Sequence, residues 1–223
     1  MTVTDRLFVI TAKGAIKAGV KILPLVRDEA LLSFSRSRIA RVPWPEGQAF
    51  MEKLLVAGKR AISQASEKCR EKAAMNFLYN FLVLGSLRRR KFREKHGFSP
   101  PYLLVISPTM KCNLSCYGCY AGSYCRRELD LDTVVNVLEE AKQMGVYFVV
   151  ISGGEPFVWK YIFDLFEIEN DVYFQVYTNG TLIDDVVAQR LSELGNVLPC
   201  ISVEGFEEET DSRRGKGCLL YTS

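Results

Sequence analysis

The sequence lacks several features that would point to a particular class of protein. It has a single histidine, His96, which lies in a basic stretch, and we assign it no ligand role. No apolar run reaches the roughly 18 residues that a membrane span requires, and no N-terminal segment pairs basic residues with an apolar core and a cleavage site. We therefore expect a cytoplasmic protein.

The sequence also lacks a large excess of charge of one sign. Lys and Arg number 29 against 26 Asp and Glu, which leaves a net charge of +3. Such a small excess does not indicate a nucleic-acid partner, so none is predicted. With 48% apolar and 25% charged residues, the chain can bury a globular core and is too balanced to be disordered throughout.

The seven cysteines do not have the pattern of a disulfide framework. Three of them fall within the segment from Cys112 to Cys119, and the others are scattered. The odd count leaves at least one thiol unpaired. A reducing compartment and a metal centre fit this distribution better than disulfides do.

Two regions of different pattern divide the chain. In residues 1–100 apolar residues recur three or four apart, which predicts a mainly helical N-terminal extension. This extension ends in a basic linker at 88–95. Residues 101–217 form the second predicted domain, and residues 218–223, which break its pattern, are expected to be a non-native tail.

The second domain alternates between short apolar runs and helical periodicity. Asp130 and Gly145 are placed to cap the first of its helices. Alternating β and α elements with short connections predict an α/β fold with a parallel sheet. The pattern predicts strands at 102–107, 147–152, 172–178 and 197–203, and helices at 131–144, 160–168 and 182–194.

Residues suited to chemistry follow the predicted strands. Cys112 to Cys119 come after the first strand, Gly153 to Pro156 after the second, Thr178 to Gly180 after the third, and Glu204 with Gly205 after the fourth. Ligands of parallel sheets gather at the carboxyl ends of the strands. The sequence therefore predicts one site built from four loops.

Cys112, Cys116 and Cys119 have the spacing Cys-x3-Cys-x2-Cys. Three soft thiolates on a compact loop can hold one face of an iron–sulfur cube and leave one iron open. A fully ligated ferredoxin-type cluster uses a fourth cysteine, and a structural zinc site normally has four Cys or His ligands. A zinc site completed by Cys125 is the alternative interpretation.

This cysteine spacing resembles the signature of the radical SAM superfamily. The resemblance implies a [4Fe-4S] cluster held by Cys112, Cys116 and Cys119, with S-adenosyl-L-methionine bound to the open iron. It also implies that an electron from the cluster cleaves this cofactor to methionine and a 5′-deoxyadenosyl radical, which removes a hydrogen atom from an unknown substrate. A reductant such as ferredoxin or flavodoxin is the implied partner.

Further segments extend the resemblance to the cofactor site. Gly153, Gly154 and Glu155 are similar to the superfamily's GGE motif, which implies contact with the methionyl ammonium group. Tyr117 is one of the two variable residues between Cys116 and Cys119. In the superfamily an aromatic residue just ahead of the last cysteine lies near the adenine of the cofactor. The resemblance implies this position for Tyr117.

The fourth-strand segment resembles that of SPASM-type radical SAM enzymes. In those enzymes a strand serine and a following arginine contact the ribose or the carboxylate of the cofactor, and Ser202 and Arg214 match these positions. The extension resembles that of anaerobe-type radical SAM proteins with a helical N-terminal segment. That group implies a family but no substrate.

The resemblance also implies a fold, a partial (β/α)6 barrel. Only about four strands of this barrel can be counted before the sequence ends. The core is therefore expected to be an incomplete barrel, preceded by the helical extension and truncated at its C-terminal side.

Two other functions compete with the enzyme. The same cysteines could serve a non-catalytic iron–sulfur electron-transfer or metal-binding module. A weak association with a membrane surface rests on Phe77, Leu78, Phe81 and Leu82, which precede the basic cluster at 88–95. A buried helix with a solvated basic end is the commoner explanation of that pattern.

Overall fold

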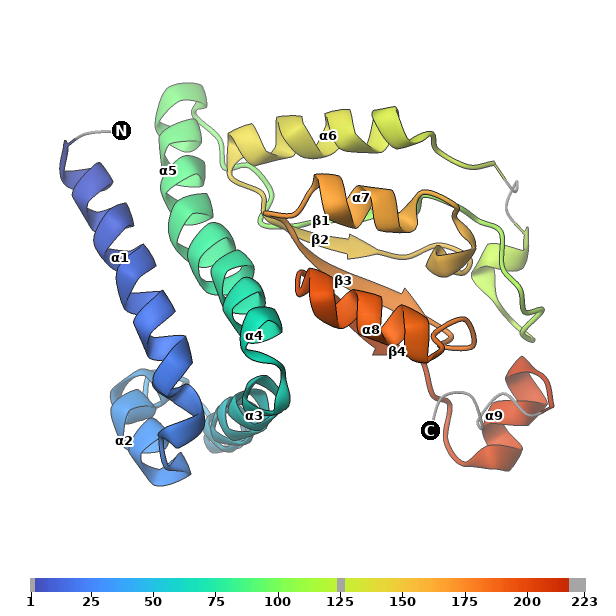
Figure 1. Cartoon of the computed structure of the whole chain (residues 1–223), viewed down its shortest axis with the longest axis horizontal. Coiled ribbons are helices and arrows are strands. Elements are labelled where there is room, and N and C mark those ends of the chain that lie inside the picture. The colour runs from blue at the N-terminus through green and yellow to red at the C-terminus, as the bar shows by residue number, and fades with distance from the viewer. Residues whose placement is uncertain (1–2, 124–126, 217–223) are drawn as a thin grey trace.

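The computed structural model describes residues 3–123 and 127–216. Its N-terminal part is helical, as the apolar spacing predicts, and η2 is a π-helical segment that continues α4 into α5 without a break (Figure 1). The helical segments of this part are α1 (Val3–Ile22), η1 (Leu23–Leu25), α2 (Asp28–Ile39), α3 (Pro45–Gln64), α4 (Glu67–Ala74), η2 (Met75–Leu84) and α5 (Gly85–His96).

The second part is an α/β fold on a four-stranded parallel sheet, which confirms the predicted fold class. The strands lie in the order β1-β2-β3-β4 and are β1 (Leu104–Ile106), β2 (Phe148–Ile151), β3 (Tyr173–Thr178) and β4 (Val197–Ile201). The helical segments are η3 (Tyr120–Ser123), α6 (Leu131–Met144), η4 (Pro156–Val158), α7 (Ile162–Ile168), α8 (Asp185–Leu194) and α9 (Glu207–Arg214).

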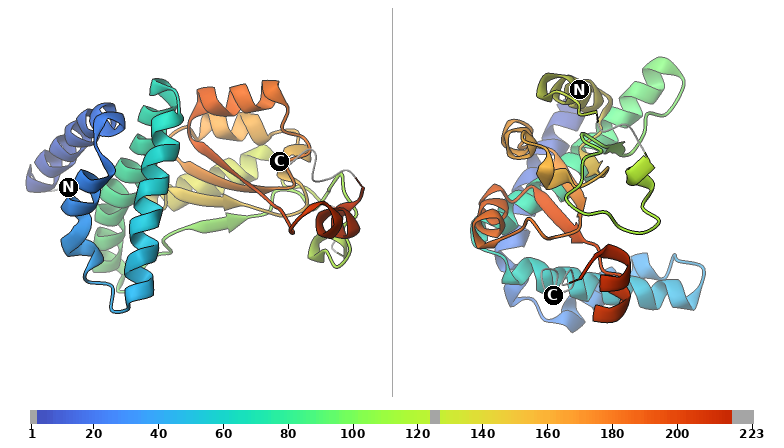
Figure 2. Two further views of the ribbon diagram at one scale, coloured as in Figure 1. Left: turned by 90° about the horizontal axis from the view of Figure 1, so that it is seen from below. Right: turned by 90° about the vertical axis from the view of Figure 1, so that its right-hand side faces the viewer.

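The core lies between the sheet and helices α6, α7 and α8, which cover one face of it (Figures 1 and 2). Alternate strand residues supply its side chains: Val149, Ile151, Phe174 and Val176 are fully buried, and Leu165 of α7 packs among them. Each such side chain contributes about 1.5–3 kcal/mol by leaving water. A slip of one residue would turn this row away from the helices, so the core fixes the register of the strands.

Helix caps set the ends of α6 as predicted. The Asp130 carboxylate accepts a hydrogen bond from the Thr133 N–H at 2.7 Å, and Gly145 ends the helix at a φ of 95°. Helix α8 begins later than predicted, at Asp185 and not at Leu182, because Asp184 serves as its N-cap.

Strand β1 is shorter than the predicted strand at 102–107. It pairs only with β2, from Leu104 opposite Val149 to Ile106 opposite Ile151. As an edge strand it has one pairing partner in the described sheet, and Pro101, which has no N–H to donate, precedes it.

The N-terminal helices pack against the amino ends of the strands (Figure 1). The Phe77 ring lies 5.3 Å from that of Tyr173, and the Phe81 ring lies 5.2 Å from that of Phe148, measured between centroids. Phe77 and Phe81, two of the four residues considered for lipid contact, therefore pack against residues of the sheet. The interpretation of this segment as a core helix explains them without a membrane.

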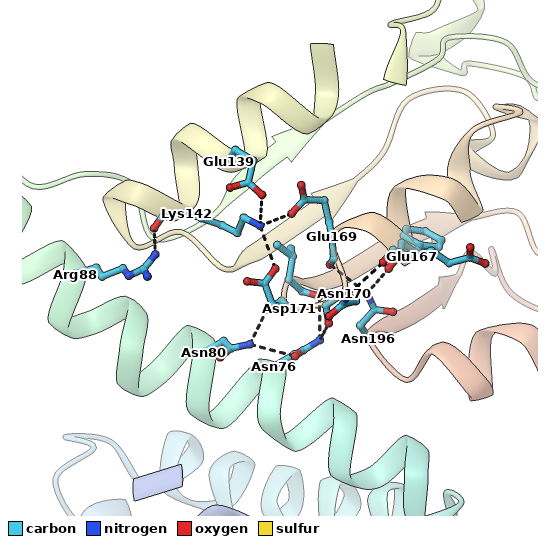
Figure 3. Close-up of polar contacts among 12 residues, drawn as sticks. Asn76, Asn80, Arg88, Glu139, Lys142, Glu167, Glu169, Asn170, Asp171 and Asn196 are labelled. Carbon is cyan, nitrogen blue, oxygen red and sulfur yellow. Dashed lines mark hydrogen bonds and ion pairs between the residues drawn. The ribbon is translucent and has the colours of Figure 1, made fainter. Parts of the chain in front are cut away.

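Polar contacts reinforce the same junction (Figure 3). Asn76 is buried and donates its amide to the Asn170 carbonyl at 2.9 Å, and Asn80 donates to the Asp171 carbonyl at 2.8 Å. These backbone carbonyls belong to the turn between α7 and β3. The amides therefore fix η2 to that turn.

Lys142 lies beside this turn and forms ion pairs with three carboxylates. Its Nζ is 2.7 Å from Glu169, 2.6 Å from Glu139 and 3.2 Å from Asp171 (Figure 3). Burial would lower the pKa of Lys142, but the carboxylates outweigh it and hold that pKa above its usual value. Burial raises the pKa of the Glu169 carboxyl, against the opposing effect of Lys142.

Within residues 3–123 and 127–216, no helix combines the length and the apolar content that a bilayer crossing needs. The division of the chain at residue 100 stays a prediction.

Candidate functional site

The carboxyl ends of the four strands lie at one edge of the sheet, away from the N-terminal helices and close to α9 (Figure 1). Four loops leave this edge, one after each strand, and they carry the residues that the sequence singles out. Parallel strands bring their carboxyl ends together, which is why segments 100 residues apart in sequence can form one site.

These loops enclose a cavity of about 260 Å³. The three predicted metal ligands line it, together with Gly153, Gly154, Ser202 and Arg214 from the predicted cofactor set. Tyr117 and Glu155, the other two predicted residues, do not line it. Its walls comprise Cys112, Cys116, Gly118, Cys119, Tyr120, Ser152, Gly153, Gly154, Tyr177, Thr178, Asn179, Ser202, Arg213 and Arg214.

Within the described residues, the cysteines of the first loop form no disulfide, with Cys119 exposed and Cys112 and Cys116 partly buried. In the described part of the chain, no three His, Cys, Asp or Glu side chains converge closely enough to hold a single metal ion. Thiolates that each bind a different iron of a cube have no need to converge on one point. The donor chemistry and the shared cavity fit an iron–sulfur cluster.

Gly153 and Gly154 are required by the way the cysteine loop packs on them. A Cβ on Gly153 would lie 2.3 Å from the Thr109 carbonyl oxygen, and one on Gly154 would lie 2.1 Å from that of Lys111. Gly153 also has a φ of 118°, which side chains disfavour. Any larger residue here would push the start of the cysteine loop away.

Glu155 is a buried residue, and its predicted contact with the cofactor stays a prediction. Its side chain is 1% exposed, and its carboxylate accepts hydrogen bonds from the Thr178 hydroxyl at 2.8 Å, the Asn179 N–H at 2.8 Å and the Phe157 N–H at 3.1 Å. Both carboxylate oxygens are thus used within the protein. In this structure Glu155 joins the loops after β2 and β3 and does not face the cavity.

Tyr120 and Tyr177, not Tyr117, are the aromatic residues that line the cavity. Tyr120 belongs to the cysteine loop. Its hydroxyl lies 3.2 Å from the Ser152 hydroxyl and 3.3 Å from the Gly153 carbonyl oxygen. The Tyr117 side chain is 85% exposed. The sequence signal for Tyr120 was its position immediately after the third cysteine.

Helix α9 returns to the cysteine loop and closes one side of the site. The Tyr117 N–H donates to the Arg213 carbonyl at 2.8 Å. Arg214 is largely buried and pairs with Glu204, which also pairs with Arg213. The hydrogen bond from Arg214 holds the pKa of the Glu204 carboxyl below its usual value. Arg214 therefore reaches the cavity as an ion pair and not as an isolated cation.

Asn179 and Asn113 were not selected from the sequence. Asn179 lines the cavity and donates its amide to the Asn113 side chain at 2.9 Å. The Thr178-Asn-Gly triplet follows the third predicted strand, but from the sequence alone a helix-entry turn explains it equally well. Cys125, the alternative fourth ligand, and residues 218–223 lie outside the described residues.

A family model described as the Radical SAM superfamily matches residues 106–220, more than half of the chain. The chain belongs to the radical SAM superfamily. The matched span starts at the end of β1 and runs past α9, so it contains all four loops of the cavity. The family indicated by the cysteine spacing is confirmed.

Curated members of the superfamily are similar over the same part of the chain. Mycofactocin maturase MftC of Mycolicibacterium smegmatis is 34% identical over 128 residues, 55% of this chain and 33% of that protein. Fe-coproporphyrin III synthase of Methanosarcina barkeri is 31% identical over 118 residues, 51% of this chain and 30% of that protein. The aligned part is about a third of each of these relatives.

Solved structures support the same fold. The crystal structure of Streptococcus suis SuiB bound to S-adenosylmethionine has a TM-score of 0.51 and covers 78% of this chain and 40% of that chain. At 23% identity the likeness concerns the fold alone.

Proposed function

We propose that this chain provides the cluster and cofactor site of a radical SAM enzyme. The observation that carries the proposal is that Cys112, Cys116 and Cys119 open onto the same cavity as Gly153 and Gly154, at the carboxyl edge of a parallel sheet. When bound, a [4Fe-4S] cluster supplies an electron that cleaves S-adenosyl-L-methionine to methionine and a 5′-deoxyadenosyl radical, which takes hydrogen from the substrate.

Different residues of the cavity wall are assigned to the cluster and to the cofactor. The three thiolates hold the cluster, and Gly153 with Gly154 presents backbone at the cavity wall, where a cofactor can approach closely. Ser202 and Arg214 line the same cavity and are assigned to the ribose or the carboxylate of the cofactor. Contact of Tyr117 and of Glu155 with the cofactor stays a prediction, and neither residue is among those that line the cavity.

The alternative of a non-catalytic iron–sulfur or metal-binding module is less well supported. The relatives are named as maturases and synthases, which are enzymes. A passive module also gives no reason for a cavity that joins the cysteine loop to the ends of the other strands.

The names of the relatives do not point to one class of substrate. The relatives include a mycofactocin maturase, a sporulation killing factor maturation protein and an Fe-coproporphyrin III synthase, and SuiB is also known bound to the precursor peptide SuiA. Because these names span peptides and a porphyrin, the likeness selects no substrate. A ferredoxin or flavodoxin reductant and a cytoplasmic location remain predictions.

Anaerobic reconstitution with iron and sulfide tests the cluster assignment. The protein should take up about four irons per chain, and replacement of Cys112, Cys116 and Cys119 by Ala together should abolish this uptake. Cys69 and Cys200, free thiols that do not line the cavity, provide the control, and their replacement should leave iron content unchanged. Stoichiometric zinc with no iron uptake would contradict the proposal.

A further inference from the structure

A buried polar cluster joins the loops that follow β1, β2 and β3. Glu155, Thr178 and Asn179 are 1%, 2% and 7% exposed. The Glu155 carboxylate accepts hydrogen bonds from the Thr178 hydroxyl and the Asn179 N–H, both at 2.8 Å. Buried polar groups are costly unless they are paired, so this pairing fixes the position of the turn after β3 relative to the loop after β2.

The Asn179 side chain carries this fixed geometry to the cysteine loop. Its Oδ1 accepts hydrogen bonds from the Thr181 N–H at 2.9 Å and from the Thr181 hydroxyl at 2.7 Å. The amide Nδ2 therefore faces the other way. It donates to Asn113 Oδ1 at 2.9 Å and lies 3.9 Å from Cys112 Sγ.

Turn formation alone does not account for this arrangement. A turn needs only the Oδ1 contacts with Thr181, two residues further on, whereas Nδ2 reaches a loop 66 residues away in sequence. The Asn113 side chain is also held in place, because its amide donates to the Thr181 hydroxyl at 2.8 Å. Cys112 Sγ also accepts the Leu114 N–H at 3.4 Å, so two N–H groups face this thiol.

We propose that Asn179 is a positioning residue that directs an amide N–H at the first cluster ligand, Cys112, and thereby raises the reduction potential of the cluster. This inference rests on the proposed function. Hydrogen bonds to the sulfurs of iron–sulfur clusters are among the levers that set their potential, and partners outside the ligand sphere also orient the ligands. An N–H aimed at sulfur favours the reduced cluster, which carries the additional negative charge.

The test is the midpoint potential of the reconstituted cluster in the full chain, measured by anaerobic redox titration followed by EPR. Asn179→Asp keeps the size of the side chain and the acceptor for Thr181 but removes the donor toward Cys112. Iron content should match the unmodified protein, and the reduction equilibrium should become about tenfold less favourable, a fall of about 59 mV for one electron. Asn179→Ala should lower the potential in the same direction.

Asn80→Ala is the matched control, because Asn80 donates its amide to the Asp171 carbonyl at the opposite end of the sheet. It should leave the potential unchanged even where it lowers stability. An unchanged potential in cluster-loaded Asn179→Asp would overturn the inference. So would loss of the cluster from both Asn179 variants while the unmodified protein retains it, since Asn179 would then serve assembly. Failure of the unmodified protein to bind iron would instead refute the proposed function.

Discussion

Replacement of Glu155 by Gln distinguishes a structural role of this residue from a direct role in cofactor binding. The structure places the carboxylate inside the protein, where it accepts three hydrogen bonds from Thr178, Asn179 and Phe157. Gln offers one acceptor oxygen, so at least one donor loses its partner and meets an NH2 group. A hydrogen bond to a charged group is worth about 1.5–3 kcal/mol, and a buried unsatisfied group costs about 1–3 kcal/mol. We therefore expect Glu155→Gln to lower the free energy of unfolding by about 3 kcal/mol.

Urea unfolding of the metal-free protein, followed by circular dichroism, measures this loss without the cofactor. Glu167→Gln is the control, because Glu167 is about half exposed and pairs with Arg190 at the surface. Such a pair contributes at most about 1 kcal/mol. Unchanged stability of Glu155→Gln together with lost S-adenosyl-L-methionine binding would contradict this expectation and show that the carboxylate acts on the cofactor directly.

Two further predictions concern packing and pH. Gly154→Ala should reduce iron uptake, since its Cβ would lie 2.1 Å from the Lys111 carbonyl oxygen, whereas Gly122→Ala, with nothing within 4 Å, should not; equal iron contents after reconstitution would contradict this. Burial raises the pKa of Glu169 above its usual value of 4.5, so this residue should contribute stability that is present below pH 4.5 and is lost as pH rises through the raised pKa. Glu169→Gln should lack this decline in urea unfolding, and an identical pH dependence in both proteins would count against it.

Much of the fold is readable from the sequence. Apolar periodicity and the caps Asp130 and Gly145 predict α6 at its observed bounds, and alternation of short apolar runs predicts the four parallel strands. Local signals of this kind act over one or two turns and need no tertiary partner. The end of a strand is less readable, as β1 shows, because it depends on which neighbour is there to pair with it.

The site shows the same division. Cysteine spacing alone predicts three residues of the cavity wall, because a single loop holds them. The motif predicts that Glu155 contacts the cofactor, but the direction of its side chain depends on donors at the end of β3 and just after it, 23 and 24 residues away. Asn179 was missed for the same reason, since its contact with the cysteine loop exists only once the sheet has formed.

We propose that the cavity at the carboxyl edge of the sheet binds S-adenosyl-L-methionine beside a cluster held by three cysteines. Formation of 5′-deoxyadenosine by the anaerobically reconstituted and chemically reduced protein tests this proposal. We expect 5′-deoxyadenosine from the unmodified protein and none from the variant with Ala at Cys112, Cys116 and Cys119. A protein that takes up a full complement of iron yet neither binds nor cleaves S-adenosyl-L-methionine would contradict it.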